Sequence, residues 1–221
     1  MLHSLRVLLV LLLIQLQSSF ESTKGSSVDD GEWAVDFSMG DEGECNIEIR
    51  DVNSITYTEF IKEYAYTKPV ILRGLTDNSN FRFLCSKSNL LKEYGEKTVR
   101  LSTANTHSYN KGFGVYTHFI KNTTSATGPG TGVPFHWHGP GFSEVIYGRK
   151  RWFLYPPDQA PEFQPNHTTL SWVSFSYPNL ELHQMPVECT IRPGEVLYFP
   201  DRWWHATLNL DTSVFISTFL G

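Results

Sequence analysis

Short apolar runs separated by turn residues dominate the second half of the sequence. The runs SEVIY and RWFLY flank Gly148, which is typical of a β-hairpin. VECTI and EVLYF flank Pro193 and Gly194, and ATLNL and SVFISTFL flank Asp211 and Thr212. Strands of this length, joined by Gly, Pro and Asp turns, predict a sandwich or a barrel.

The first half carries helical patterns as well. TYTEFIKEYAYTKP, residues 56–69, has helical spacing, with Thr58 as the expected N-cap and Pro69 beyond the C-terminus. PVILRGL is predicted to be a buried strand, NLLKEYGEK a short helix that ends near Gly95, and TVRLSTA another strand. The pattern predicts an α+β, mainly β domain, whose N-terminal helices pack on the outside of a β-barrel core.

Residues 1–22 have the layout of a secretory signal peptide. Arg6 precedes an unbroken apolar stretch from Val7 to Ile14, and small polar residues follow from Ser18. A bilayer-spanning helix needs about 20 apolar residues, so this stretch is too short for one, and an uncleaved anchor is the alternative. No later stretch is apolar enough either, and we expect no transmembrane segment in the mature chain.

Acidic side chains dominate residues 23–50, which carry no basic residue between Gly25 and Ile49. Such a segment is typical of a solvated, disordered chain, with order beginning near Cys45; an acidic ligand for a basic partner is the alternative. The remaining residues, 51–221, are enough for one folded domain with a sizeable core. The net charge of −5 argues against nucleic acid as a partner.

The cysteines and glycosylation motifs fit an oxidising compartment. Cys45, Cys85 and Cys189 allow one disulfide and one free thiol, in any of the three pairings, or three free thiols. Asn122 and Asn166 begin the motifs NTT and NHT, which predicts glycosylation of both at the surface of a secreted chain.

Residues 133–142, VPFHWHGPGF, hold two histidines one residue apart. On a strand, residues i and i+2 point to the same face, so His136 and His138 face one way and Trp137 the other. His205, in DRWWHATLNL, joins them if its strand is a neighbour. Three imidazoles on rigid strands make a ligand set for Fe(II), Zn(II), Ni(II) or Cu(II). An H-x-H pair also occurs by coincidence, so the spacing alone leaves both interpretations open.

FHWHGPGFSEVIYGRKRWFLYPP, followed by RPGEVLYFPDRWWHATLNL, resembles the JmjC (jumonji-C) family. The resemblance runs from about Asp51, where a helix and KPVILRGL match, to the C-terminus. It implies a double-stranded β-helix, the cupin-type jelly roll, and the family's active members are Fe(II)- and 2-oxoglutarate-dependent oxygenases. His136 and His205 fall on two of the family's metal ligands. Lys150 falls on the lysine that pairs with the distal carboxylate of 2-oxoglutarate; without the resemblance, a solvated hairpin lysine is the simpler interpretation.

The sequence departs from the family at the second metal ligand. The family has Asp or Glu two residues after its first histidine, whereas this chain has His138. Three neutral imidazoles lack the anionic ligand of a 2-His-1-carboxylate site, which puts ordinary 2-oxoglutarate turnover in doubt. Glu144 or Asp201 is a poorer source of a carboxylate, because we expect the first on the outside of a hairpin and the second in a turn.

A second departure lies at about 104–134, where the chain is shorter than family members usually are. A shortened segment there leaves a barrel edge incomplete, which favours partner-dependent folding over catalysis.

These observations favour one function and leave two alternatives open. We expect a non-catalytic or atypical JmjC protein that binds protein clients or signalling partners in the lumen of the endoplasmic reticulum, although the chain ends in FISTFLG without a KDEL-like signal. The alternative is an active protein hydroxylase, with Fe(II) at His136, His138 and His205 and 2-oxoglutarate at Lys150. A zinc protein is a third interpretation, and histone demethylation conflicts with the signal sequence. The partner's identity stays open, and an oligomer is compatible with the sequence.

Overall fold

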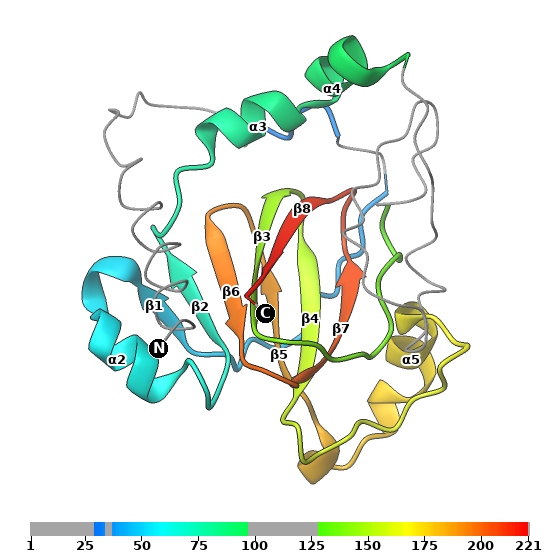
Figure 1. The fold of residues 1–221 in the computed structure, drawn as a ribbon. Coiled ribbons are helices and arrows are strands. Elements are labelled where there is room, and N and C mark those ends of the chain that lie inside the picture. The colour runs from blue at the N-terminus through cyan, green and yellow to red at the C-terminus, as the bar shows by residue number, and fades with distance from the viewer. Residues whose placement is uncertain (1–28, 34–36, 97–127, 221) are drawn as a thin grey trace.

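The computed structural model describes residues 29–33, 37–96 and 128–220, and its strands form two sheets (Figure 1). The larger sheet has the order β1-β2-β6-β3-β8 and the smaller has the order β5-β4-β7. All neighbours are antiparallel except β1 and β2. The strands are β1 (Ile49–Asp51), β2 (Val70–Arg73), β3 (Gly141–Tyr147), β4 (Lys150–Tyr155), β5 (Val187–Ile191), β6 (Glu195–Phe199), β7 (Trp204–Asn209) and β8 (Val214–Phe219).

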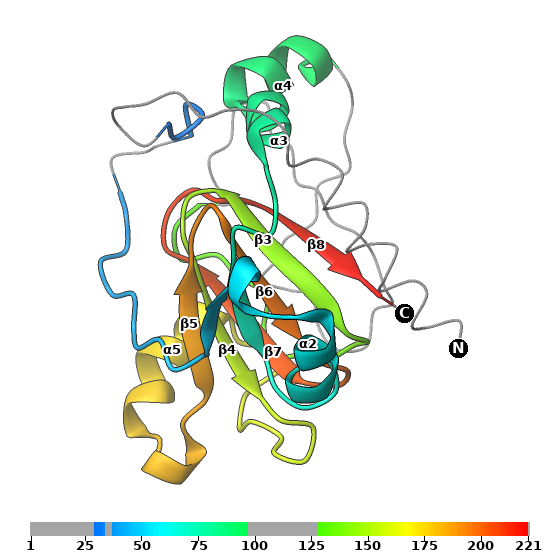
Figure 2. The same ribbon diagram turned by 90° about the vertical axis from the view of Figure 1, so that its left-hand side faces the viewer.

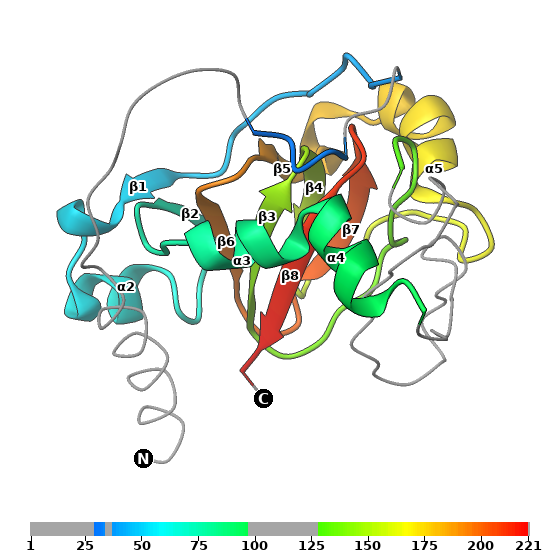
Figure 3. The ribbon, with the colours of Figure 1, turned by 90° about the horizontal axis from the view of Figure 1, so that it is seen from above.

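Residues on both faces of β2, β4 and β6 are buried, which explains why these strands lack the alternation of a half-exposed sheet. Val145, Trp152 and Leu197, from three different strands, belong to the core between the sheets. A second cluster joins the outer face of the larger sheet to α2 (Tyr57–Glu63), and a third joins the smaller sheet to α5 (Thr169–Phe175). Figure 3 shows these two helices on opposite sides of the molecule, which confirms the predicted packing of helices around a β core.

Two further helices, α3 (Ser79–Cys85) and α4 (Lys87–Tyr94), lie beyond one end of the sheets (Figures 1 and 2). The hydroxyl of Tyr147 on β3 donates a hydrogen bond of 2.5 Å to the carbonyl of Arg82, which ties α3 to the sheet. The helix α4 ends at Gly95, whose N–H donates to the carbonyl of Leu91, as the sequence predicted. Short 3-10 turns lie at Val52–Ser54, Tyr177–Asn179 and Leu182–Gln184.

The helix α2 is present as predicted, but its N-cap is not the predicted residue. The Oγ1 of Thr56 accepts the N–H of Glu59 at 3.2 Å, and the Glu59 carboxylate accepts the N–H of Thr56 at 3.1 Å. This reciprocal pair is a capping box. Thr58 lies exposed in the first turn instead, because a Thr with Glu three residues later satisfies two free N–H groups.

The hairpin predicted around Gly148 is wrong. Both strands exist, but β3 pairs with β6 and β8, whereas β4 pairs with β5 and β7. Gly148, with a φ of +81°, turns the chain from one sheet into the other. A Cβ at this position would lie 2.5 Å from the carbonyl oxygen of Thr212, so glycine is required. The turn residues thus predicted that the chain reverses at Gly148, but not which strands β3 and β4 pair with.

Residues 37–47, here called the N-terminal strap, pack along the smaller sheet. Glu42 forms ion pairs with Arg149 and Arg192, which hold the pKa of its carboxyl below the usual value. The N–H of Met39 donates to the carbonyl of Leu210 at 2.8 Å. The disorder predicted for the acidic segment is therefore wrong for the strap, because arginines distant in the sequence neutralise its charge.

A disulfide fastens the strap to the sheet. Cys45 is bonded to Cys189 on β5, across 144 residues of sequence, and Cys85 at the end of α3 is a free thiol. The expectation of one disulfide and one free thiol is confirmed, and the structure selects one of the three pairings. Burial raises the pKa of the Cys85 thiol.

Several predictions concern residues outside the described ranges: the signal peptide at 1–22, the strand TVRLSTA, most of the segment at 104–134, and glycosylation of Asn122. Asn166, the other predicted glycosylation site, lies exposed in a turn. No helix in the described part of the chain is long and apolar enough to cross a membrane.

Candidate metal centre

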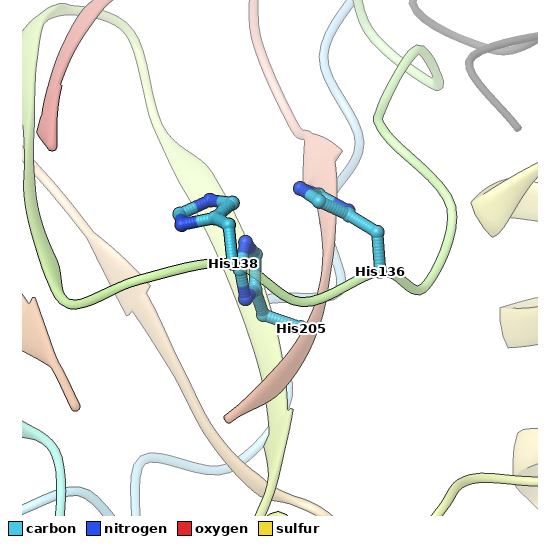
Figure 4. Close-up of side chains that lie close together, drawn as sticks. All are labelled: His136, His138 and His205. Atoms are coloured by element: carbon cyan, nitrogen blue, oxygen red, sulfur yellow. The ribbon is translucent and has the colours of Figure 1, made fainter. Parts of the chain in front are cut away.

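His136 and His138 lie in the stretch before β3, and His205 is the second residue of β7 (Figure 4). The backbones of His136 and His205 form an antiparallel bridge, with N–H···O distances of 3.1 and 2.8 Å. Trp137, between the two histidines, is 42% exposed. The structure therefore brings the three histidines together, as expected if their strands are neighbours.

One ring nitrogen from each histidine lies within 4.8 Å of the others. The ring centroids are 4.2 Å apart for His136 and His205, 4.7 Å for His138 and His205, and 5.5 Å for His136 and His138. Ligand nitrogens about 2 Å from an ion lie roughly 3 Å from one another, so a small movement of the rings closes them on a metal. Among the described residues, no Asp, Glu or Cys joins this group.

The backbone holds each histidine in one tautomer. Each Nδ1 lies 2.8–2.9 Å from a backbone carbonyl oxygen, that of Pro134 for His136, Gly139 for His138 and Trp203 for His205. A carbonyl only accepts hydrogen bonds, so Nδ1 carries the hydrogen and Nε2 keeps the lone pair that binds a metal. Metal-ligating histidines commonly have such a second partner, which also fixes the orientation of the ring.

Burial keeps the imidazoles of His205 and His138 neutral. It lowers the pKa of His205 well below its ordinary value, and the proximity of His136 and His138 lowers that pKa further. Burial also lowers the pKa of His138, against a smaller opposite effect of its hydrogen bond to Gly139. Only a deprotonated imidazole nitrogen binds a metal, so His205 and His138 are in the ligand form at neutral pH.

The stretch before His136 approaches β7 closely because of Gly132. A Cβ on Gly132 would lie 1.7 Å from the carbonyl oxygen of Thr207. The N–H of Val133 donates to Thr207 Oγ1 at 3.1 Å, and the N–H of Thr207 donates to the carbonyl of Val133 at 2.9 Å. These contacts keep His136 in register with His205.

Lys150, the first residue of β4, is 1% exposed and points between the sheets. Its Nζ donates to Asn209 Oδ1 at 2.9 Å and lies 3.8 Å from the ring centroid of Phe215 on β8. Burial lowers the pKa of this amine to about 7. The alternative interpretation, a solvated hairpin lysine, is therefore wrong.

Trp152 lies between Lys150 and His205 on the inner face of the smaller sheet. Its ring centroid is 5.8 Å from that of His205, and its Nε1 is buried without a hydrogen-bond partner. An unpaired buried N–H costs about 1–3 kcal/mol, so such a group calls for an acceptor from a water or ligand. The sequence gives no signal for this role, because an aromatic residue in a strand is ordinary core.

Neither of the other carboxylates considered from the sequence reaches the histidines. Glu144 accepts hydrogen bonds from Thr76 and Asn78 on the outer side of the larger sheet. Asp201 is exposed in the turn before β7, where its carboxylate lies 3.3 Å from the Arg202 guanidinium. Within the described ranges, the candidate ligand set therefore consists of three imidazoles.

These residues fit a divalent first-row transition metal. Imidazole is a good ligand for iron, zinc, nickel and copper, and three protein ligands leave positions open for water or a small molecule. Lys150 and Trp152 supply hydrogen-bond donors in the same interior space.

Comparison with known proteins agrees with this architecture. Residues 136–219 match the cupin-like domain family. The chain is 54% identical over 228 residues to JmjC domain-containing protein 8 of Mus musculus, covering 82% of this chain and 84% of that protein. It is 31% identical over 99 residues to the 2-oxoglutarate and iron-dependent oxygenase JMJD4 of Mus musculus, covering 40% of this chain and 23% of the other. The Escherichia coli ribosomal oxygenase YcfD, solved with cobalt and succinic acid, is 21% identical at a TM-score of 0.27, over 40% of this chain and 19% of that one.

The match to the mouse protein spans most of both chains, and the cupin-like match begins at the first histidine of the cluster and ends in β8. The paired sheets, with the chain crossing from one to the other at Gly148, agree with that domain type. The chain therefore belongs to the family of JmjC domain-containing protein 8 and has a cupin-like fold.

Proposed function

We propose that this chain is a luminal JmjC protein that holds a divalent transition metal at His136, His138 and His205 and acts by binding other proteins. The observation that carries the metal site is the set of three Nε2 lone pairs, presented together by backbone-fixed tautomers. An anionic ligand is missing from this set, so the centre differs from the 2-His-1-carboxylate site of iron oxygenases. That difference favours an atypical or non-catalytic protein over an ordinary oxygenase.

The exposed apolar side chains of α3 support a protein partner. Phe81, Phe83 and Leu84 are 50%, 66% and 57% exposed, respectively, and lie within about one turn of a short helix. Clustered apolar surface of this kind commonly marks a protein-binding site. A photoreactive residue at position 83 is expected to crosslink a partner in intact cells, whereas one at the exposed Lys62 is not. Equal yields at both positions would contradict a partner site on α3.

A location in the endoplasmic reticulum is part of the same proposal. The apolar stretch after Arg6 and the exposed position of Asn166 support it. We expect the chain from cells to shift in mobility after endoglycosidase treatment, and Asn166→Gln to remove part of that shift. A chain without glycans in the soluble cytosolic fraction would contradict the location.

A second function, a protein hydroxylase, is favoured by Lys150 and Trp152. A buried amine and an unpaired indole N–H near the histidines are donors suited to an acidic cosubstrate. Fe(II) and 2-oxoglutarate, when bound, would supply the oxidising chemistry. The chain's own residues would orient the acid and keep water out of the space between the sheets.

Metal content and turnover test both functions together. We expect the purified chain to bind one divalent metal, and His205→Ala to weaken binding by more than about tenfold. His183→Ala is the matched control, because its side chain is 75% exposed and remote from the cluster. Absence of metal from the wild type would contradict the proposed centre.

Formation of succinate from 2-oxoglutarate then separates the two functions. The non-catalytic proposal predicts none in the wild type, and His138→Asp restores the family's carboxylate. Turnover that appears only in His138→Asp supports the proposal. Wild-type turnover that disappears in His205→Ala would establish the hydroxylase instead.

A further inference from the structure

We propose that Arg202 is a positioning residue of the metal centre, because its left-handed backbone aims its N–H at the carbonyl of His138 and holds that ligand beside the other two. The inference rests on the metal site proposed above and concerns how the chain keeps that site assembled. Arg202 acts here through its backbone and not through its charge.

The backbone conformation of Arg202 is unusual for its residue type. Within the described ranges, only two residues other than glycine have a positive φ, and Arg202 is one of them, with a φ of +57°. A Cβ in this region crowds the backbone, so residues other than glycine, asparagine and aspartate seldom adopt it. Such a conformation persists only where the surrounding contacts enforce it, and it is frequent near functional sites.

This conformation belongs to the turn that leads from β6 into β7. The N–H of Trp203 lies 3.5 Å from the carbonyl oxygen of Pro200, so Asp201 and Arg202 are the two central residues of the turn. Asp201 is not among the residues with a positive φ, whereas Arg202 is, and this is the pattern of a type II turn. The second central position of such a turn favours glycine or asparagine, and this chain has an arginine there.

The sign of this φ decides where the amide between the two central residues points. A type I turn differs from a type II turn by a flip of that amide, which reverses the direction of its N–H. In the observed turn, the N–H of Arg202 donates to the carbonyl of His138 at 2.9 Å. After a flip, the carbonyl of Asp201 would point to that side instead. The left-handed conformation of Arg202 therefore makes this hydrogen bond possible.

His138 depends on this contact more than the other two ligands do. His205 lies on β7, and two backbone hydrogen bonds join His136 to it. His138 lies two residues beyond this bridge and outside any strand (Figure 4). The ring of Phe219 packs edge-on against the His138 ring, with centroids 4.4 Å apart, which limits rotation of the side chain. The N–H of Arg202 fixes the backbone from which that side chain projects.

The side chain of Arg202 makes no comparable contact within the described ranges. It is 67% exposed, and its guanidinium lies 3.3 Å from the carboxylate of Asp201, which is itself 54% exposed. Ion pairs between exposed side chains contribute little to stability. Substitutions of Arg202 should therefore act according to the backbone preference of the new residue, and not according to its charge.

The test is the affinity of the purified full chain for Co(II), together with the visible absorption of the bound ion, which reports the number and arrangement of its ligands. Arg202→Val should weaken Co(II) binding by about tenfold, because a β-branched residue rarely adopts the left-handed region. Its spectrum should change toward that of His138→Ala. Arg202→Asn removes the charge but tolerates the left-handed region, so it should keep the wild-type affinity and spectrum.

Glu32 provides a matched control, because it is the other described residue of this kind, with a φ of +65°. Its neighbour Gly31 packs against the ring of Tyr147 at the end of β3, whereas the three-histidine cluster lies near the start of that strand. Glu32→Val should therefore lower the midpoint of urea unfolding without a change in Co(II) affinity or spectrum.

The outcomes separate the two proposals. Wild-type affinity and spectrum in Arg202→Val would overturn the positioning role and leave the three-histidine centre intact. Equal weakening in Arg202→Asn and Arg202→Val would also overturn it, since the charge would then matter and not the backbone. A wild type that binds no Co(II) would overturn both proposals. If urea unfolding shows that Arg202→Val does not fold, Arg202→Ala replaces it, and a wild-type spectrum in that variant would overturn the role.

Discussion

At the scale of single residues, Lys150 shows how burial changes the chemistry of an ordinary surface side chain. Its ammonium form loses hydration between the sheets and gains only uncharged partners, the Asn209 amide and the Phe215 ring, so the folded chain disfavours the charge. Burial of this amine therefore opposes folding when the amine is charged.

The lowered pKa of Lys150 predicts a specific dependence of stability on pH. Between pH 7 and 10.5 the unfolded chain holds a proton that the folded chain has lost, so raising the pH in this window favours folding. The free energy of unfolding should therefore rise by about 2 kcal/mol from pH 7 to pH 9 relative to Lys150→Met. Urea unfolding at both pH values measures this difference. Parallel pH profiles for the two proteins would contradict it, and Lys62→Met serves as the exposed control.

At the scale of elements, α2 depends on its first turn more than on its apolar pattern. The helix has only seven residues, too few to be stable alone in water. It contributes Phe60, which packs edge-on against Tyr198 of β6 with ring centroids 5.0 Å apart. The cap at Thr56 therefore fixes where the chain enters the helix and how this aromatic side chain reaches the sheet.

The two threonines at the start of α2 provide a matched pair of substitutions. Thr56→Ala should lower the free energy of unfolding by about 1 kcal/mol, because it removes a hydrogen bond of the capping box. Thr58→Ala should change it by less than about 0.5 kcal/mol, because Thr58 is exposed and alanine favours a helix. Chemical unfolding followed by circular dichroism compares them. Equal losses would show that the cap is not at Thr56.

At the scale of the whole molecule, the N-terminal strap ties the beginning of the described chain to strands near its end. It does so by the disulfide between Cys45 and Cys189, by the ion pairs of Glu42 and by backbone hydrogen bonds. Asn46 belongs to this connection, since its N–H donates to the carbonyl of Glu188 at 3.0 Å. The β5 edge is thereby covered.

Removal of the disulfide should destabilise the protein considerably. Cys45→Ser opens a loop of 144 residues, for which loss of the constraint on the unfolded chain predicts about 3–5 kcal/mol. Cys85→Ser is the control and should cost less than about 1 kcal/mol, since Cys85 is a free and partly exposed thiol. Urea unfolding gives both values, and limited proteolysis should cut the strap faster in Cys45→Ser. An unchanged midpoint for Cys45→Ser would show that the ion pairs alone hold the strap.

The features that the sequence predicted are those that depend on local pattern. The H-x-H alternation placed His136 and His138 on one face, and the apolar runs located the strands. The interior place of Lys150 was implied only by resemblance, because a lysine between two arginines in a turn has an ordinary local explanation.

The local pattern could not predict contacts between segments that are distant in the sequence. Arg149 neutralises Glu42 from 107 residues away, and no local signal in an acidic stretch marks its partner. Gly148 specified a change of direction, but the choice of pairing partner depends on how the eight described strands pack together. The indole N–H of Trp152 is unpaired because the packing around its ring buries it without an acceptor, and this packing involves residues from several strands.

Gly132 has a consequence for inherited variation in this chain. Gly132 is not one of the three histidine ligands, yet any side chain at this position would collide with Thr207 on β7 and displace His136 from His205. A missense change at this glycine would thus mimic the loss of a histidine while leaving all three histidines in the gene. Surveys of variants that score only the histidines would overlook it.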